Sequence, residues 1–230
     1  MRALLEFAVR GRIPATLIAA GFAGVSLVPH LRFLALFAGA LIGLVALRHG
    51  LYEGLFVLAG TATLFVVAAT FLIDGSLQPH LVPLAWSVAV ILLLSWFWTW
   101  VMAGALHRGN RQGYAMLVGA VVGVSAILAF PLFVPDSGDW WREVIVTLGE
   151  SLRALSPGTD PVFFDQLIEV FSARASTMTG MVVSAAIFIG IVMMLMGRWW
   201  HAILDNPGGF SREFRQLNLE RRISIVVLLT

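Results

Sequence analysis

Long apolar stretches without a charged residue in their interiors limit how this chain can fold. Six spans are expected, at residues 13–28, 33–47, 54–73, 81–106, 113–134 and 176–197. Most reach the roughly 20 residues that a helix needs to cross a hydrocarbon core of about 30 Å. The first two are short, so we expect them to sit in a thinned region, to extend into the interface or to be shielded by neighbouring helices. The pattern predicts an all-α transmembrane helical bundle that forms a single domain over residues 1–230.

Composition supports a membrane location and excludes several classes of function. The chain is 59% hydrophobic and 12% charged, which lies outside the range of soluble globular proteins. It has no cysteine, so disulfides and thiolate metal sites are excluded. The net charge of +2 is too small to indicate nucleic-acid binding. We therefore expect an integral membrane protein with the lipid bilayer as its main partner and no cofactor.

The distribution of arginines predicts the orientation. Arg2, Arg10 and Arg12 precede the first span, but no convincing small-x-small cleavage site follows before Pro29, so we expect an uncleaved span. With the N-terminus in the cytoplasm, most basic residues lie inside, as the positive-inside rule requires. The inner set is Arg2, Arg10, Arg12, Arg48, Arg108, Arg111, Arg198, Arg212, Arg215, Arg221 and Arg222, and the outer set is Arg32, Arg142, Arg153 and Arg174. This predicts a multi-pass protein of the bacterial inner membrane.

The one long outer connection, residues 135–175, is expected to be helical. Apolar residues from Trp141 to Leu155 recur at three- and four-residue steps, which is typical of an amphipathic helix lying on a membrane. Ser156-Pro157-Gly158 should end it, and Asp160 with Pro161 should start a second helix as N-cap and first helical residue. That second helix could continue into the sixth span and would then project well beyond the bilayer.

The C-terminal part is predicted to be a cytoplasmic loop at 198–222 followed by the start of a seventh span. The apolar run 223–230 covers only about 12 Å as a helix, so it cannot cross, and the chain is expected to be truncated there.

Two outer turns share a hexapeptide. Residues 26–31 (SLVPHL) recur at 76–81 (SLQPHL) and differ only at Val28 and Gln78. A duplicated hairpin is conceivable; alternatively, proline simply ends a helix and histidine sits at the interface. His30, Asp74 and His80 lie on the same predicted side, so they could bind a divalent metal or a substrate, although interfacial histidines usually only bridge water and lipid. His49, His107 and His201 flank spans on the inner side and receive less weight.

Small residues repeat at four-residue steps on three spans. Ala15, Ala19 and Ala23 form one smooth stripe, and the pairs Gly39 with Gly43 and Gly119 with Gly123 repeat the pattern. Such stripes either pack the bundle internally or, less often, dock a partner subunit.

Tryptophans crowd the fourth span. Trp96, Trp98 and Trp100 are spaced by two, so on a helix they point in different directions and cannot form one wall of a ligand pocket. Together with Trp86 they are expected to form a lipid-facing or interfacial belt.

The spans carry almost no ionisable groups. Proton-driven pumps and channels place ionisable residues in the membrane interior. Apart from Asp74 near an outer end, the predicted spans have no such residue there. Coupled secondary transport and catalysis inside the membrane are therefore not expected, and the chain is not predicted to be an enzyme.

The stretch 197–222, GRWWHAILDNPGGFSREFRQLNLERR, resembles the YybS-like family of polytopic bacterial membrane proteins. The likeness lies chiefly in Arg198-Trp199-Trp200, expected to anchor at the interface, followed by Asn206-Pro207-Gly208-Gly209-Phe210, a sharp cytoplasmic turn. Members of that family look longer, and their function is not established. The resemblance therefore implies an architecture and no active site.

That family is similar in outline to the substrate-binding membrane subunits of energy-coupling-factor transporters. The resemblance implies a compact six-helix bundle that binds a small molecule from outside, with Ala15, Ala19 and Ala23 as the stripe that meets the coupling subunit. The long outer segment 135–174 and a seventh span depart from that pattern.

Two functions remain open. The first is a membrane subunit that captures a small solute and takes energy from a membrane coupling subunit and an ATPase, since the chain has no phosphate-binding glycine loop. The second is a non-transporting scaffold that docks partners through its cytoplasmic loop or outer helices.

Overall fold

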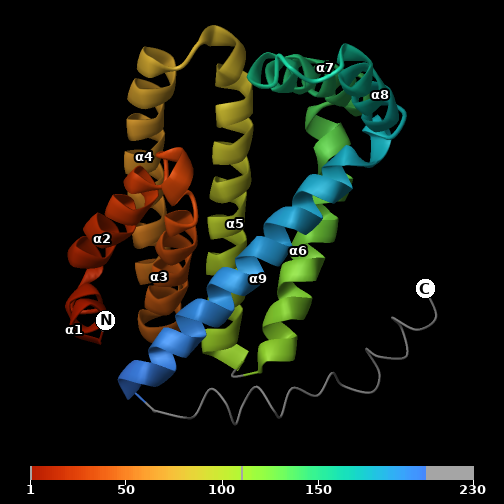
Figure 1. Ribbon diagram of the computed structural model, residues 1–230. Coiled ribbons are helices and arrows are strands. Elements are labelled where there is room, and N and C mark those ends of the chain that lie inside the picture. Colours follow the sequence, from red (N-terminus) through yellow and green to blue (C-terminus); the bar gives the residue numbers. More distant parts are fainter. Residues whose placement is uncertain (1, 110, 206–230) are drawn as a thin grey trace.

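A computed structural model describes residues 2–109 and 111–205, and within these ranges the side chains of residues 2–4, 29, 73, 74 and 76 are not described. This part of the chain is all-α, with helices joined by short turns (Figure 1). The helices are α1 (Arg2–Ala8), α2 (Arg12–Val25), η1 (Pro29–Leu31), α3 (Leu34–His49), α4 (Leu51–Ser76), η2 (Pro79–Leu81), α5 (Val82–Gly109), α6 (Gln112–Phe133), α7 (Ser137–Leu155), α8 (Pro161–Ser172), η3 (Ala175–Thr177) and α9 (Met178–Asp205).

Four of the six expected spans are helices long and apolar enough to cross a membrane. They cover Leu51–Leu72, Pro79–Gly109, Gln112–Phe133 and Ala175–Asp205. The other two are the shorter apolar helices α2 and α3, with 14 and 16 residues. At 1.5 Å per residue these measure only about 21 and 24 Å.

The long helices give the bundle two distinct ends (Figure 1). At the basal end, α3 finishes at His49 and α9 at Asp205, and α1 lies beside them. At the capped end, α7 and α8 lie across the bundle near the end of α6. Helix α9 runs obliquely from the capped to the basal end and packs on α3 and α5.

Helices α2 and α3 form a hairpin that enters from the basal end and turns back halfway along the bundle (Figure 1). The indole N–H of Trp96 donates to the carbonyl oxygen of Ala35 at 3.1 Å. Trp96 lies at the middle of the 28-residue α5, and Ala35 is the second residue of α3. The side chain of Phe65, near the middle of α4, meets the Trp96 ring edge-on at 5.1 Å. The hairpin tip therefore lies close to the middle of α4 and α5.

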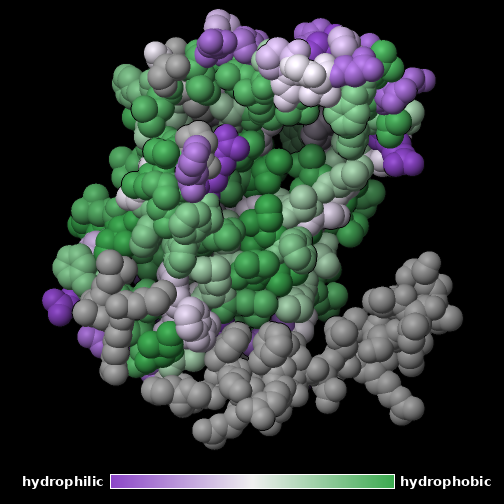
Figure 2. Space-filling view, in the orientation of Figure 1, coloured by the Kyte–Doolittle hydropathy of each residue, from purple (hydrophilic) through white to green (hydrophobic). Residues whose placement is uncertain are grey.

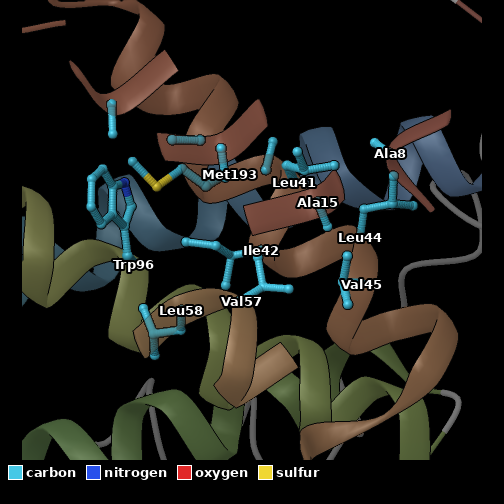
Figure 3. Close-up of a cluster of buried hydrophobic side chains, with 14 of the residues drawn as sticks. Ala8, Ala15, Leu41, Ile42, Leu44, Val45, Val57, Leu58, Trp96 and Met193 are labelled. Atoms are coloured by element: carbon cyan, nitrogen blue, oxygen red, sulfur yellow. The ribbon is translucent and has the colours of Figure 1, made fainter. Parts of the chain in front are cut away.

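The tryptophans of α5 belong to the interior, so the expected lipid-facing belt is wrong. Trp96 and Trp98 are buried, and each donates its indole N–H to a backbone carbonyl of a neighbouring helix. Trp98 reaches Gly119 on α6 at 3.1 Å, and half-buried Trp100 reaches Leu51 on α4 at 3.0 Å. Their spacing by two does point them in different directions, and it thereby ties α5 to three helices. Figure 3 shows Trp96 beside Met193 in this core.

Glycines allow α3 and α6 to approach α5 and α9 closely, which confirms internal packing for both glycine pairs. A Cβ atom at Gly39 would lie 2.9 Å from Trp96, and one at Gly43 would lie 3.0 Å from Thr99. Gly119 meets Met102 in the same way, and Gly123 meets Ile187. Because helices in lipid associate mainly through van der Waals packing, these contacts carry much of the tertiary structure.

The segment after α6 folds as two helices, with the expected break between Leu155 and Pro161. Asp160 caps α8: its side chain accepts a hydrogen bond from the backbone N–H of Val162 at 3.0 Å. The helix does not continue into the last span, because α8 ends at Ser172 and η3 separates it from α9. Since α7 packs on α8 and on η3, the segment lies across the bundle and does not project from it.

Candidate functional site

A hollow lies at the capped end, beyond the tip of the α2–α3 hairpin. Figure 2 shows it below α7 and α8, between the hairpin tip and α9, with mostly apolar atoms in its walls. It exists because the hairpin stops halfway, which leaves the outer half of the bundle with fewer helices. The outer half of α5 reflects this: residues 82–88 are all half-buried, although they point in every direction around the helix.

Two basic side chains lie at the hairpin tip. His30 is in η1 and Arg32 follows it as C-cap, and both are exposed. Figure 2 shows hydrophilic atoms at this place within a broad apolar belt. Proline fixes the turn, because the residue before it, Val28, is held in the extended region at φ −73° and ψ 124°.

The repeated hexapeptide forms the same local structure twice. Pro79–Leu81 is again a single 3₁₀ turn after an extended residue, Gln78. The two turns nevertheless lie at different levels, since η1 is beside the middle of α4 and η2 lies beyond its end (Figure 1). This favours the simpler interpretation of the repeat, in which proline ends a helix.

The structure places the two histidines of the predicted metal or substrate trio apart. His30 and His80 lie in the two separate turns, and the side chain of Asp74 is outside the described set. Among the described residues, no group of three histidine, aspartate or glutamate side chains is close enough to hold a metal ion.

The alanine stripe is covered by the chain itself. Ala15, Ala19 and Ala23 are each 0% exposed, because α2 packs on α3 and α4. Thr16 beside them fills the space above Gly60 of α4, where a Cβ atom would lie 2.6 Å from Thr16 Cγ2. In this conformation the stripe packs the hairpin onto the bundle, as the internal-packing alternative expects, and partner binding by these alanines stays a prediction.

This placement makes Ala19→Leu a test of hairpin packing. The added carbons have no room, so the free energy of unfolding should fall by about 1–3 kcal/mol. Gly21→Leu is the control, because a Cβ atom at Gly21 on the same helix meets nothing within 4 Å. Thermal unfolding in detergent, followed by circular dichroism, measures both. Equal midpoints for the two variants would contradict the buried position of the stripe.

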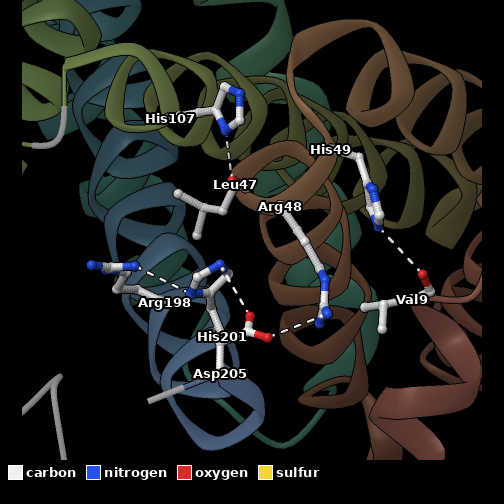
Figure 4. Close-up of polar contacts among 8 residues, drawn as sticks. All are labelled: Val9, Leu47, Arg48, His49, His107, Arg198, His201 and Asp205. Atoms are coloured by element: carbon white, nitrogen blue, oxygen red, sulfur yellow. Dashed lines mark hydrogen bonds and ion pairs between the residues drawn. The ribbon is translucent and has the colours of Figure 1, made fainter.

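A polar cluster ties α3 to the end of α9 at the basal end. Asp205 lies between Arg48 at 3.2 Å and His201 at 3.4 Å (Figure 4). Arg198 lies 3.3 Å from His201, one turn earlier on α9. Arg48 and Asp205 are each about one-third exposed, so this pair stabilises the fold by less than about 1 kcal/mol. The main effect of the pair is to fix the end of α9 against α3.

Two further histidines join helix ends by hydrogen bonds to the backbone. His107 Nδ1 lies 2.7 Å from the carbonyl oxygen of Leu47, and His49 Nε2 lies 3.3 Å from that of Val9 (Figure 4). Neither histidine was expected to form a site. Only the spacing of Arg198, His201 and Asp205 at three and four residues could have indicated one polar face.

A small pocket opens beside this cluster. It has a volume of about 270 Å³ and is lined by Glu6, Val9, Arg10, Arg48 and Leu204. These residues come from α1, the turn after it, α3 and α9, so the pocket lies at the basal end, where the chain begins and α9 ends.

The motif of the family resemblance lies only partly in the described chain. Arg198, Trp199 and Trp200 form part of the end of α9, whereas Asn206, Pro207, Gly208, Gly209 and Phe210 are outside the described residues. Trp200 is buried and stacks on Phe37 of α3 at 5.7 Å, while Trp199 is 44% exposed. Only Trp199 of the pair is therefore in a position to anchor at an interface.

Comparison with known proteins does not assign a family. No protein-family model matches the chain, and neither a curated protein nor a solved structure does.

Proposed function

We propose that this chain is a membrane subunit that binds a small solute from the capped side and relies on partner subunits for energy. The single observation that carries the proposal is the half-length hairpin, which leaves a hollow between its tip and α9. Ligand sites in membrane bundles typically lie near the bilayer midplane, at the ends of helices that do not cross completely.

In this proposal four helices cross the membrane and α2–α3 is re-entrant. A hairpin that enters and leaves on one side does not change the sidedness of the later helices. The capped end is then outside and the basal end cytoplasmic, because Arg10, Arg12, Arg48, Arg108 and Arg198 lie toward the basal end. The membrane in this proposal is the bacterial inner membrane. Helices α7 and α8 then lie on its outward-facing surface.

Energy would come from partners at the basal end. The sequence has no phosphate-binding glycine loop, so ATP hydrolysis belongs to another subunit. The pocket beside Arg48 and the exposed Trp199 are the surfaces available there. A resemblance to energy-coupling-factor transporters would make that partner a coupling subunit with an ATPase pair. No catalytic role is proposed for this chain.

The second candidate is a non-transporting scaffold. It is favoured by the large apolar side chains that α7 and α8 expose: Trp140, Val146, Leu155, Val162, Phe163, Val170 and Phe171. These could contact another envelope protein as readily as lipid. In that case the hollow would be filled by a partner and would bind no solute.

Purification of the full-length protein from its native membrane in mild detergent tests the two candidates. Mass spectrometry would identify the proteins and small molecules that remain bound. Recovery of an ATP-hydrolysing pair with a coupling subunit, or of a stoichiometric small solute, would support the proposal. Recovery of assembly factors with neither would replace it by the scaffold.

A further inference from the structure

We infer, on the basis of the proposed function, that the solute carries an anionic group, a carboxylate or a phosphate, which binds Arg32 at the hairpin tip beside His30. The inference depends on the depth of this arginine, on the charges around it and on the chemistry of a guanidinium.

Arg32 lies deep in the proposed membrane. Its carbonyl oxygen accepts the backbone N–H of Ala35 at 3.1 Å, so the two residues are one turn apart. Ala35 is level with Trp96 at the middle of α5. One turn is about 5 Å, and half the hydrocarbon core is about 15 Å. About 10 Å therefore remains between Arg32 and the headgroups, a distance over which a charge is stable only if water or a counterion reaches it.

No described side chain neutralises Arg32. The ion pairs and side-chain hydrogen bonds of the described residues do not include its guanidinium. The two helix ends at the tip also contribute little, because the C-terminus of α2 and the N-terminus of α3 carry partial charges of opposite sign. The net field at the tip is therefore set by the arginine, and it attracts anions.

The acidic residues of the cap do not reverse this sign. Glu143 and Glu150 lie on the exposed face of α7, while the half-buried positions between them are apolar. Asp139 is paired with Arg142, and Asp165 with Arg153. Exposed charges at the surface are screened by salt over about 10 Å, whereas a charge at membrane depth is screened far less.

The chemistry at the tip suits an oxyanion. A guanidinium presents paired N–H donors that match the two oxygens of a carboxylate or phosphate. His30 adds a further ring N–H donor within the same turn. The mostly apolar walls of the hollow would receive the remainder of the solute.

The absence of cysteine allows a direct electrical test in the intact protein. A single cysteine at Leu31, between the two basic residues, is labelled in sealed right-side-out vesicles with impermeant methanethiosulfonates of opposite charge. A cysteine at Gly158, in the exposed turn between α7 and α8, provides the reference rates. We expect the ratio of anionic to cationic labelling rates at position 31 to exceed the reference ratio by about tenfold. Arg32→Gln should remove that excess, Arg32→Lys should keep it, and Arg174→Gln should not change it.

The outcomes separate the two proposals. Reaction with neither reagent at position 31, while position 158 reacts, would mean that no water-filled hollow reaches the tip, and the proposed function would fail. Reaction with both at the reference ratio would overturn only the anionic assignment. The measurement is repeated with phosphatidylglycerol added to the vesicles. Loss of the anionic preference in these vesicles would identify a lipid headgroup as the occupant and overturn the inference that a solute binds Arg32. An unchanged preference would support that inference.

Discussion

Replacing Trp96 by alanine is expected to lower the free energy of unfolding by about 3 kcal/mol, the lower end of the range for a buried tryptophan. The lower end applies because lipid or detergent, and not water, surrounds the separated helices. Trp96 is 0% exposed, packs edge-on against Phe65 and donates its N–H to Ala35. Its loss would leave a cavity and remove a hydrogen bond where the hairpin meets α4 and α5. For a chain of this length the unfolding midpoint should fall by about 6–12 °C.

Two comparisons isolate the cause of that loss. Trp199→Ala removes the same atoms from a side chain that is 44% exposed, so its midpoint should change little. Trp96→Phe keeps most of the ring contacts and removes only the N–H donor, so it should cost about 1 kcal/mol. If Trp96→Ala and Trp199→Ala unfolded at the same temperature in detergent, the central position of Trp96 would be contradicted.

The helical class and the break in the outer segment could be predicted because they depend on local physics. Uninterrupted apolar length predicts a spanning helix, and four such helices are present. The Asp160-Pro161 pair predicts a helix start, and Asp160 caps α8 as expected. These patterns need no knowledge of distant residues.

The hairpin depth and the tryptophan contacts could not be predicted, because they depend on neighbours. The sequence showed that the first two spans were short, but a short apolar helix can cross a thinned membrane or turn back inside it. Long-range contacts such as the one between Trp96 and Ala35 fix its depth. In the same way, a tryptophan suits an interface or a core equally well, and the choice depends on which carbonyl its N–H can reach. The position of Arg32, on which the candidate site depends, follows from this long-range contact.

The crossing of α3 and α9 explains why a glycine is needed where the family resemblance begins. A Cβ atom at Gly197 would lie 2.7 Å from the carbonyl oxygen of Ala40 and 3.1 Å from the backbone nitrogen of Leu44. Both obstructing atoms are backbone, so no side-chain rotation can relieve the contact. A larger residue must push α9 away from α3, and this would also separate Asp205 from Arg48 and Trp200 from Phe37.

Gly197→Val should therefore lower the free energy of unfolding by about 3 kcal/mol, the upper end of the usual cost of overpacking. Gly180→Val is the matched control, since it lies on the same helix and a Cβ atom there meets nothing within 4 Å. Valine is a better helix former than glycine by about 0.4 kcal/mol, and this small gain is shared by both variants and cancels in their difference. Thermal unfolding in detergent measures that difference.

Because the clash is at the basal end and the hollow is at the capped end, a folded fraction of Gly197→Val should retain the labelling ratio at position 31. Loss of that ratio without loss of stability would mean that the α3–α9 contact controls the hollow directly.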